Sequence, residues 1–206
     1  MKKENKMKAD QAKEEIRYIK EMIDRTRATT ADSGIYLILW GVLTILAITT
    51  MYILVHFERF EWIWLNWILF MVVGAIFTII HKTKNQHKQR VKTYAYIAVE
   101  HLWIACGIGF ILLGFVFPLA RLYSFGVIPV AMAVIAGIGV FVSGGIYAWS
   151  LLKWCGILWW AGGIGLLFVH ANYRGILMIP LLILGYLVPG IIFNIKYRKN
   201  GKNNDS

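Results

Sequence analysis

Six stretches of the sequence are almost entirely apolar, and each is close to the length of one membrane-crossing helix. A helix of about 20 residues spans the roughly 30 Å of hydrocarbon in a bilayer. Lipid offers the backbone no hydrogen-bond partners, so a chain that crosses it must be helical. We therefore predict an all-α, polytopic membrane bundle of six transmembrane helices, at 34–55, 62–80, 94–117, 124–148, 151–169 and 175–195.

The basic residues between these stretches predict the orientation of the chain. Nineteen of the 22 Lys and Arg residues lie in the first, third, fifth and seventh flanking segments, including nine in 1–33 and five in 81–93. Lys and Arg accumulate in cytoplasmic loops. We therefore expect both termini to be cytoplasmic, in the plasma (inner) membrane, with the transmembrane domain at 34–195 and a basic tail at 196–206.

The net charge of +11 does not indicate nucleic-acid binding, because the basic residues flank the apolar stretches and no recognition motif accompanies them. The sequence has no zinc-protease, nucleophile-elbow or nucleotide-loop motif, so we expect no enzyme and no cofactor. Cys106 and Cys155 fall at different expected depths, which disfavours a disulfide. The lipid bilayer is the first expected partner.

The segment 1–33 contains a second feature, an amphipathic helix predicted at about 9–27. Its apolar positions recur at spacings of three and four, which places them on one side of a helix. Two interpretations fit: the helix lies on the bundle or on lipid headgroups, or it docks a membrane or cytoplasmic protein partner or a second copy of the chain. The predicted docking stripe comprises Ile16, Ile19 and Ile23.

Small residues are concentrated in the stretches 124–148 and 151–169. Small side chains let membrane helices approach closely, so we expect these two helices to make the tightest contact. The alternative is a substrate groove lined by exposed backbone. The residues predicted to pack helices together are Gly137, Gly139, Ser143, Gly144 and Gly163.

Glu100 and His101 form the one adjacent ionisable pair inside a predicted span. An ionisable group at membrane depth is costly and is a candidate functional site. Three interpretations fit Glu100: anchoring at headgroup level, an ion pair with Lys153 at similar depth, or a proton or cation site. Neighbouring residues point about 100° apart on a helix, so Glu100 and His101 cannot both face one small cavity.

The chain also repeats itself weakly. Residues 102–109 (LWIACGIG) match 158–165 (LWWAGGIG) at six of eight positions. This match favours tandem helical hairpins that run in the same direction, as parallel repeats do in some transporters. Chance similarity is the alternative, because Gly, Trp and Leu are common in membrane helices.

Two segments carry a resemblance. Residues 14–46 (EEIRYIKEMIDRTRATTADSGIYLILWGVLTIL) and the motifs GIGVFVSGGIYAW and LVPGIIFNIKYR within 137–198 resemble an uncharacterised family of small bacterial integral membrane proteins. The resemblance implies a six-helix fold and assigns no functional residues. The leading hypothesis is a non-catalytic regulatory or assembly partner that acts through its cytoplasmic face. The alternative is a small transporter or channel built from hairpin repeats, with Glu100 as its proton or cation site.

Overall fold

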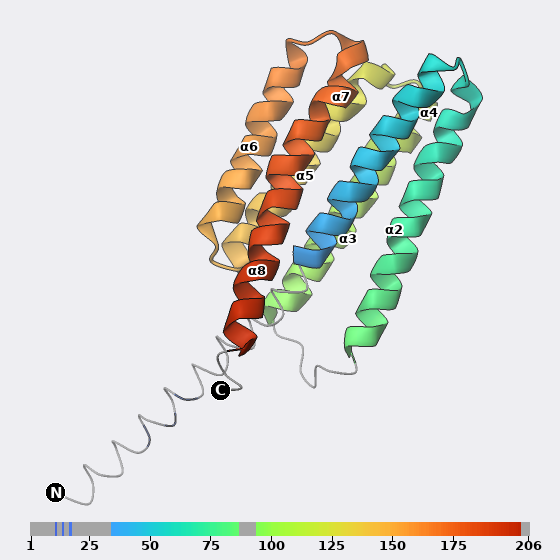
Figure 1. Cartoon of the computed structure of the whole chain (residues 1–206). Coiled ribbons are helices and arrows are strands. Elements are labelled where there is room, and N and C mark those ends of the chain that lie inside the picture. The colour runs from blue at the N-terminus through green and yellow to red at the C-terminus, as the bar shows by residue number, and fades with distance from the viewer. Residues whose placement is uncertain (1–10, 12–13, 15–16, 18–33, 87–93, 203–206) are drawn as a thin grey trace, which may run out of the picture.

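The computed structural model describes residues 11, 14, 17, 34–86 and 94–202, and this part of the chain is helical with short turns and contains no strand. The predicted docking stripe Ile16, Ile19 and Ile23 lies outside the described residues. The described residues form six long helices, which run up and down the bundle (Figure 1). All six are long and apolar enough to cross a membrane: Gly34–His56, Phe60–Lys84, Tyr94–Leu119, Phe125–Ile146, Ser150–Leu167 and Ala171–Ile195.

Four of the six helices are built from more than one element. The second joins a 3-10 turn to an α-helix, η1 (Phe60–Trp62) and α2 (Ile63–Gln86), and the fourth joins η3 (Phe125–Val127) and α5 (Ile128–Ile146). The fifth is the single helix α6 (Ser150–Leu167). The third and sixth are each interrupted by a π-helix, giving α3 (Tyr94–Ile111), η2 (Leu112–Val116), α4 (Phe117–Leu119) and α7 (Ala171–Leu182), η4 (Ile183–Leu187), α8 (Val188–Lys202).

Three hairpin turns share one capping geometry. Glu58, Arg121 and Ala148 adopt positive φ angles of 56°, 57° and 52°. The residue after each donates its N–H to a carbonyl five positions back, at 2.9, 3.1 and 2.9 Å, which is the Schellman pattern. These caps stop the first, third and fourth helices sharply, so the connections are short and successive helices lie antiparallel.

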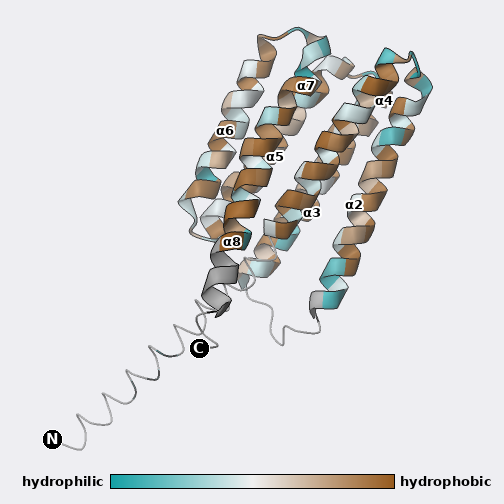
Figure 2. Ribbon diagram, in the orientation of Figure 1, coloured by the Kyte–Doolittle hydropathy of each residue, from teal (hydrophilic) through white to brown (hydrophobic). Residues whose placement is uncertain are grey.

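The centre of the bundle is packed around α5 and α6, which make the most extensive contact among the labelled elements. Trp159 is 1% exposed, and Val140 and Leu182 are also buried. Hydrophobic residues predominate along the middle of the helices, and hydrophilic residues lie near several of their ends (Figure 2). The contact between α5 and α6 agrees with the close approach expected from their small residues.

Candidate functional site

The predicted polar site contains an ion pair that the sequence did not suggest. The Nζ atom of Lys82, near the end of α2, donates to Oε1 of Glu100, in the second turn of α3. The two side chains are 33% and 23% exposed, so the pair sits at the border of the bundle and not in its centre. A carboxylate that is compensated in this way costs much less at membrane depth than an isolated one.

The other two residues predicted for this site lie apart from the pair. His101 is exposed, and its Nδ1 atom lies 2.8 Å from the Ile97 carbonyl of its own helix. Lys153 is half-buried in the first turn of α6, and within the described residues its side chain forms no ion pair with Glu100. An ion pair with Lys153 was one of the three interpretations of Glu100, and the partner in the structure is Lys82 instead.

A second contact lies beside the ion pair. The Nδ1 atom of His81 lies 3.3 Å from the hydroxyl of Tyr36, and the two rings meet edge to face with centroids 5.4 Å apart. Tyr36 belongs to the first helix, so residues 81 and 82 of α2 connect it to both the first helix and α3. Three helices are thus joined at one end of the bundle.

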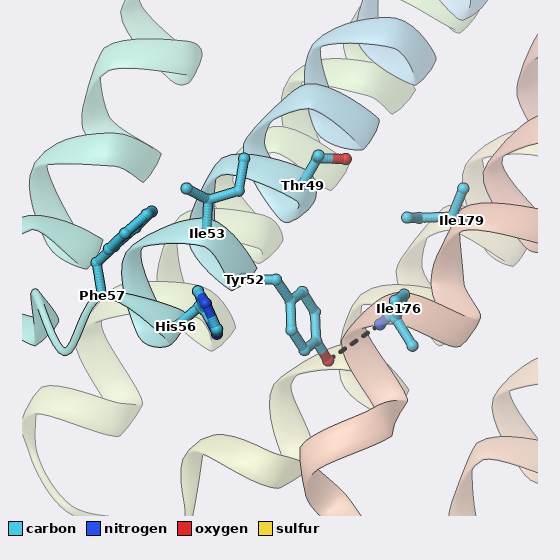
Figure 3. Close-up of a pocket in the computed structure, with 7 residues that line it drawn as sticks. All are labelled: Thr49, Tyr52, Ile53, His56, Phe57, Ile176 and Ile179. Carbon is cyan, nitrogen blue, oxygen red and sulfur yellow. Dashed lines mark hydrogen bonds between the residues drawn. The ribbon is translucent and has the colours of Figure 1, made fainter.

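The opposite end of the first helix contains a shallow apolar groove of about 300 Å³ (Figure 3). Within it, the Tyr52 hydroxyl donates to the Asn172 carbonyl at 2.6 Å and accepts from the Ile176 N–H at 3.1 Å. In a regular α-helix that carbonyl and that N–H pair with each other, so Tyr52 bridges one turn of α7. The groove is lined by Thr49, Tyr52, Ile53, His56, Phe57, Ile176 and Ile179.

The groove is lined mainly by apolar side chains. No charged side chain lines it, and its three polar residues include Tyr52, whose hydroxyl is already engaged with α7. Sequence reasoning missed this feature because a Tyr within an apolar stretch gives no sign of which helix it will meet.

The predicted packing glycines lie where helices touch. A Cβ atom on Gly137 would lie 2.3 Å from Nε1 of Trp160, and one on Gly144 would lie 2.7 Å from the backbone nitrogen of Lys153. A Cβ on Gly163 would lie 3.1 Å from that of Ala133. Other helices therefore occupy the space beside these glycines, which leaves no room there for a substrate.

Ser143 and Gly139 belong to the contact between α5 and α3. The Ser143 hydroxyl donates to the Gly139 carbonyl at 2.7 Å and accepts from the indole N–H of Trp103 at 3.1 Å. A Cβ on Gly139 would lie 3.1 Å from the Trp103 ring. This polar cross-link fixes α3 against α5 inside the bundle.

Comparison with known proteins gives no family assignment: no protein-family model, curated protein or solved structure matches the chain. Among the residues that the structure describes, no group of three or more His, Cys, Asp or Glu side chains is placed to hold a metal ion. The geometry of this chain is therefore the only guide to its function.

The ion pair gives a direct prediction. In a double-mutant cycle, Lys82→Ala and Glu100→Ala should show a coupling of about 1 kcal/mol in the free energy of unfolding, because the pair is only partly exposed. The measurement is reversible denaturation in mixed micelles. The same cycle with Lys153→Ala in place of Lys82→Ala serves as the control and should show coupling near zero. Equal coupling in both cycles would contradict the pairing.

Proposed function

We propose that this chain is a non-catalytic, multi-pass plasma-membrane protein that acts as a regulatory or assembly partner through its cytoplasmic face. The observation that carries the proposal is the filled interior: Gly137 and Gly144 meet neighbouring helices directly, and Trp159 occupies the centre. A bundle packed in this way leaves its surfaces as the place for recognition.

Charge supports the choice of surface. The start of the first helix, the end of α2, the start of α3 and the end of α8 lie at one end of the bundle (Figure 1). The chain segments that adjoin this end carry most of the Lys and Arg residues. Because such segments stay in the cytoplasm, this end is the proposed cytoplasmic face and both termini belong to it.

The proposed contact element is the stripe Ile16, Ile19 and Ile23 in segment 1–33, which rests on the spacing of these residues in the sequence. On the charged side of the same segment, Glu14 and Arg17 form an ion pair at 3.8 Å with side chains 77% and 74% exposed. An apolar stripe opposite such a solvated side is typical of a helix that lays its apolar side on a protein partner or a second copy.

The proposal is tested by capturing the full-length protein from membranes with its partners. Replacing Ile16, Ile19 and Ile23 together with serine should abolish the specific co-purification or self-association, because it removes the apolar contact but keeps every charge. Glu14→Gln is the matched control on the charged side and should capture the same partners as the unmodified chain. Recovery of an unchanged partner set with the serine variant would refute the docking stripe.

A small transporter is the second candidate, because π-helices interrupt two of the six helices and interrupted helices build the binding sites of several transporters. Glu100 is a weak candidate for the proton or cation site of such a transporter. Its carboxylate is compensated by Lys82 at the proposed cytoplasmic border and does not stand free in a central cavity.

A further inference from the structure

The two π-helices are built from matching sequences. The segment 112–118 reads LLGFVFP and 183–189 reads ILGYLVP, so that Leu, Gly and Pro recur at the same three positions and the other four positions are aliphatic or aromatic in both. In both segments the first five residues form the π-helix, η2 or η4, and the proline follows two residues after its end.

The proline explains why each π-helix leaves a carbonyl without a helical partner. The N–H groups of Phe117 and Val188 donate five residues back, to Leu112 and Ile183. With the same five-residue spacing, the next N–H donors would be Pro118 and Pro189, and proline has no N–H to donate. The carbonyls of Leu113 and Leu184, which occupy the same motif position, therefore need another donor.

Each of these two carbonyls receives a donor from a side chain outside its own helix. The hydroxyl of Tyr123 donates to Leu113, and the thiol of Cys155 donates to Leu184 with a sulfur–oxygen distance of 3.7 Å. A phenol is protonated at neutral pH and can donate, and desolvation raises the pKa of Tyr123 further. A side-chain donor thus closes each break: Tyr123 lies in the turn after its own helix, and Cys155 lies in the neighbouring helix α6.

The aromatic residue of the motif also makes the same contact twice. Phe115 packs on Trp64 of the preceding helix α2, with ring centroids 5.5 Å apart and planes at 50°. Tyr186 packs on Trp159 of the preceding helix α6, with centroids 5.1 Å apart and planes at 56°. In both helices the aromatic residue of the motif therefore packs on a tryptophan of the preceding helix, at a similar ring distance and angle.

The contacts among whole helices follow the same correspondence. The first helix packs on η4 and α8, where a Cβ on Gly41 would lie 3.0 Å from Leu187. The fourth helix packs on η2 and α3, where a Cβ on Gly114 would lie 2.9 Å from Met132. The first two helices of each half also contact each other. Asn66 of α2 donates to the Ala47 carbonyl of the first helix at 3.0 Å, and α5 packs on α6.

We propose that residues 34–119 and 125–195 form two copies of one three-helix unit with opposite orientation, and that their proline-terminated π-helices are matched hinges of a single motion. The third and sixth helices run in opposite directions, because two spans lie between them in an up-and-down bundle (Figure 1). This arrangement differs from tandem hairpins of one direction, and inverted units of this kind can exchange conformations across the membrane.

Hydrogen exchange of the full-length protein in lipid nanodiscs tests the hinges. In the unmodified chain, amides in 113–117 and 184–188 should exchange at least about tenfold faster than those in the uninterrupted middle of α5. Tyr123→Phe and Cys155→Ala each remove one donor and should accelerate exchange in the adjacent π-helix about fivefold. Because the hinges belong to one motion, each variant should also accelerate exchange in the distant π-helix.

Tyr173→Phe is the matched control, because it also removes a phenol hydroxyl but lies at the start of α7, where the side chain is 63% exposed. It should leave exchange in both π-helices unchanged. Exchange in either π-helix no faster than in α5 would overturn the proposal, and this measurement needs no variant. An effect confined to the π-helix next to each substitution would overturn it as well, since the two hinges would then move independently.

Discussion

Replacing Gly144 with alanine is expected to lower the free energy of unfolding by about 3 kcal/mol, the upper part of the range for overpacked cores. The new Cβ would lie 2.7 Å from the backbone nitrogen of Lys153 and 3.0 Å from the carbonyl carbon of Leu152. Both atoms are backbone, so relief requires moving the first turn of α6 away from α5. Reversible unfolding in mixed micelles measures the change.

The neighbouring Gly145 is the matched control. A Cβ at Gly145 meets nothing within 4 Å. Alanine there should leave stability unchanged or raise it by up to about 1 kcal/mol, because alanine is the better helix former. Gly156→Ala should resemble Gly144→Ala, since its Cβ would lie 2.8 Å from the Phe141 backbone. Equal stability of the Gly144 and Gly145 variants would show that α5 and α6 do not approach this closely.

Trp159→Ala is expected to cost about 4 kcal/mol of unfolding free energy, whereas Trp159→Phe should cost far less. The side chain is 1% exposed and contacts Tyr186, so its removal leaves a cavity in the centre of the bundle. Its indole N–H, however, is buried without a hydrogen-bond partner among the described residues. Phenylalanine removes that unpaired donor, which offsets part of the lost contact area.

Thermal unfolding followed by size-exclusion chromatography compares these variants. Trp154, in the same helix and 68% exposed, provides the control. Trp154→Ala should change stability by less than about 0.5 kcal/mol. A Trp159→Phe variant as unstable as Trp159→Ala would indicate that the indole N–H has a partner after all.

The sequence predicted the number and placement of the six helices well, because apolar length alone marks a span. It located their ends less well. A span predicted from hydropathy ends at its last apolar residue. The helices themselves continue into the polar residues that follow, so that α2 ends at Gln86 and α8 at Lys202. The extension of α2 is what places Lys82 beside Glu100, so the partner of Glu100 was missed for this reason.

The π-helices were not predicted, for a different physical reason. Helical periodicity is read from the contrast between apolar and polar residues, and a uniformly apolar stretch offers none. Pro118 was assigned to a loop, although it lies inside the third helix. The signal was the recurrence of Leu-Gly-aromatic followed by proline in 112–118 and 183–189, which a search for repeats between helices of opposite direction would have found.

The bridge that Tyr52 makes to α7 bears on the order in which the protein assembles. The N–H of Ile176 bonds to the Tyr52 hydroxyl, and the carbonyl of Ile176 faces Pro180, which has no N–H to give it. The two hydrogen bonds of Tyr52 can therefore form only after the last span has been inserted beside the first. Assembly of the bundle should accordingly finish when the last span packs against the first. A protein interrupted before its last span should leave that side of the first span uncovered.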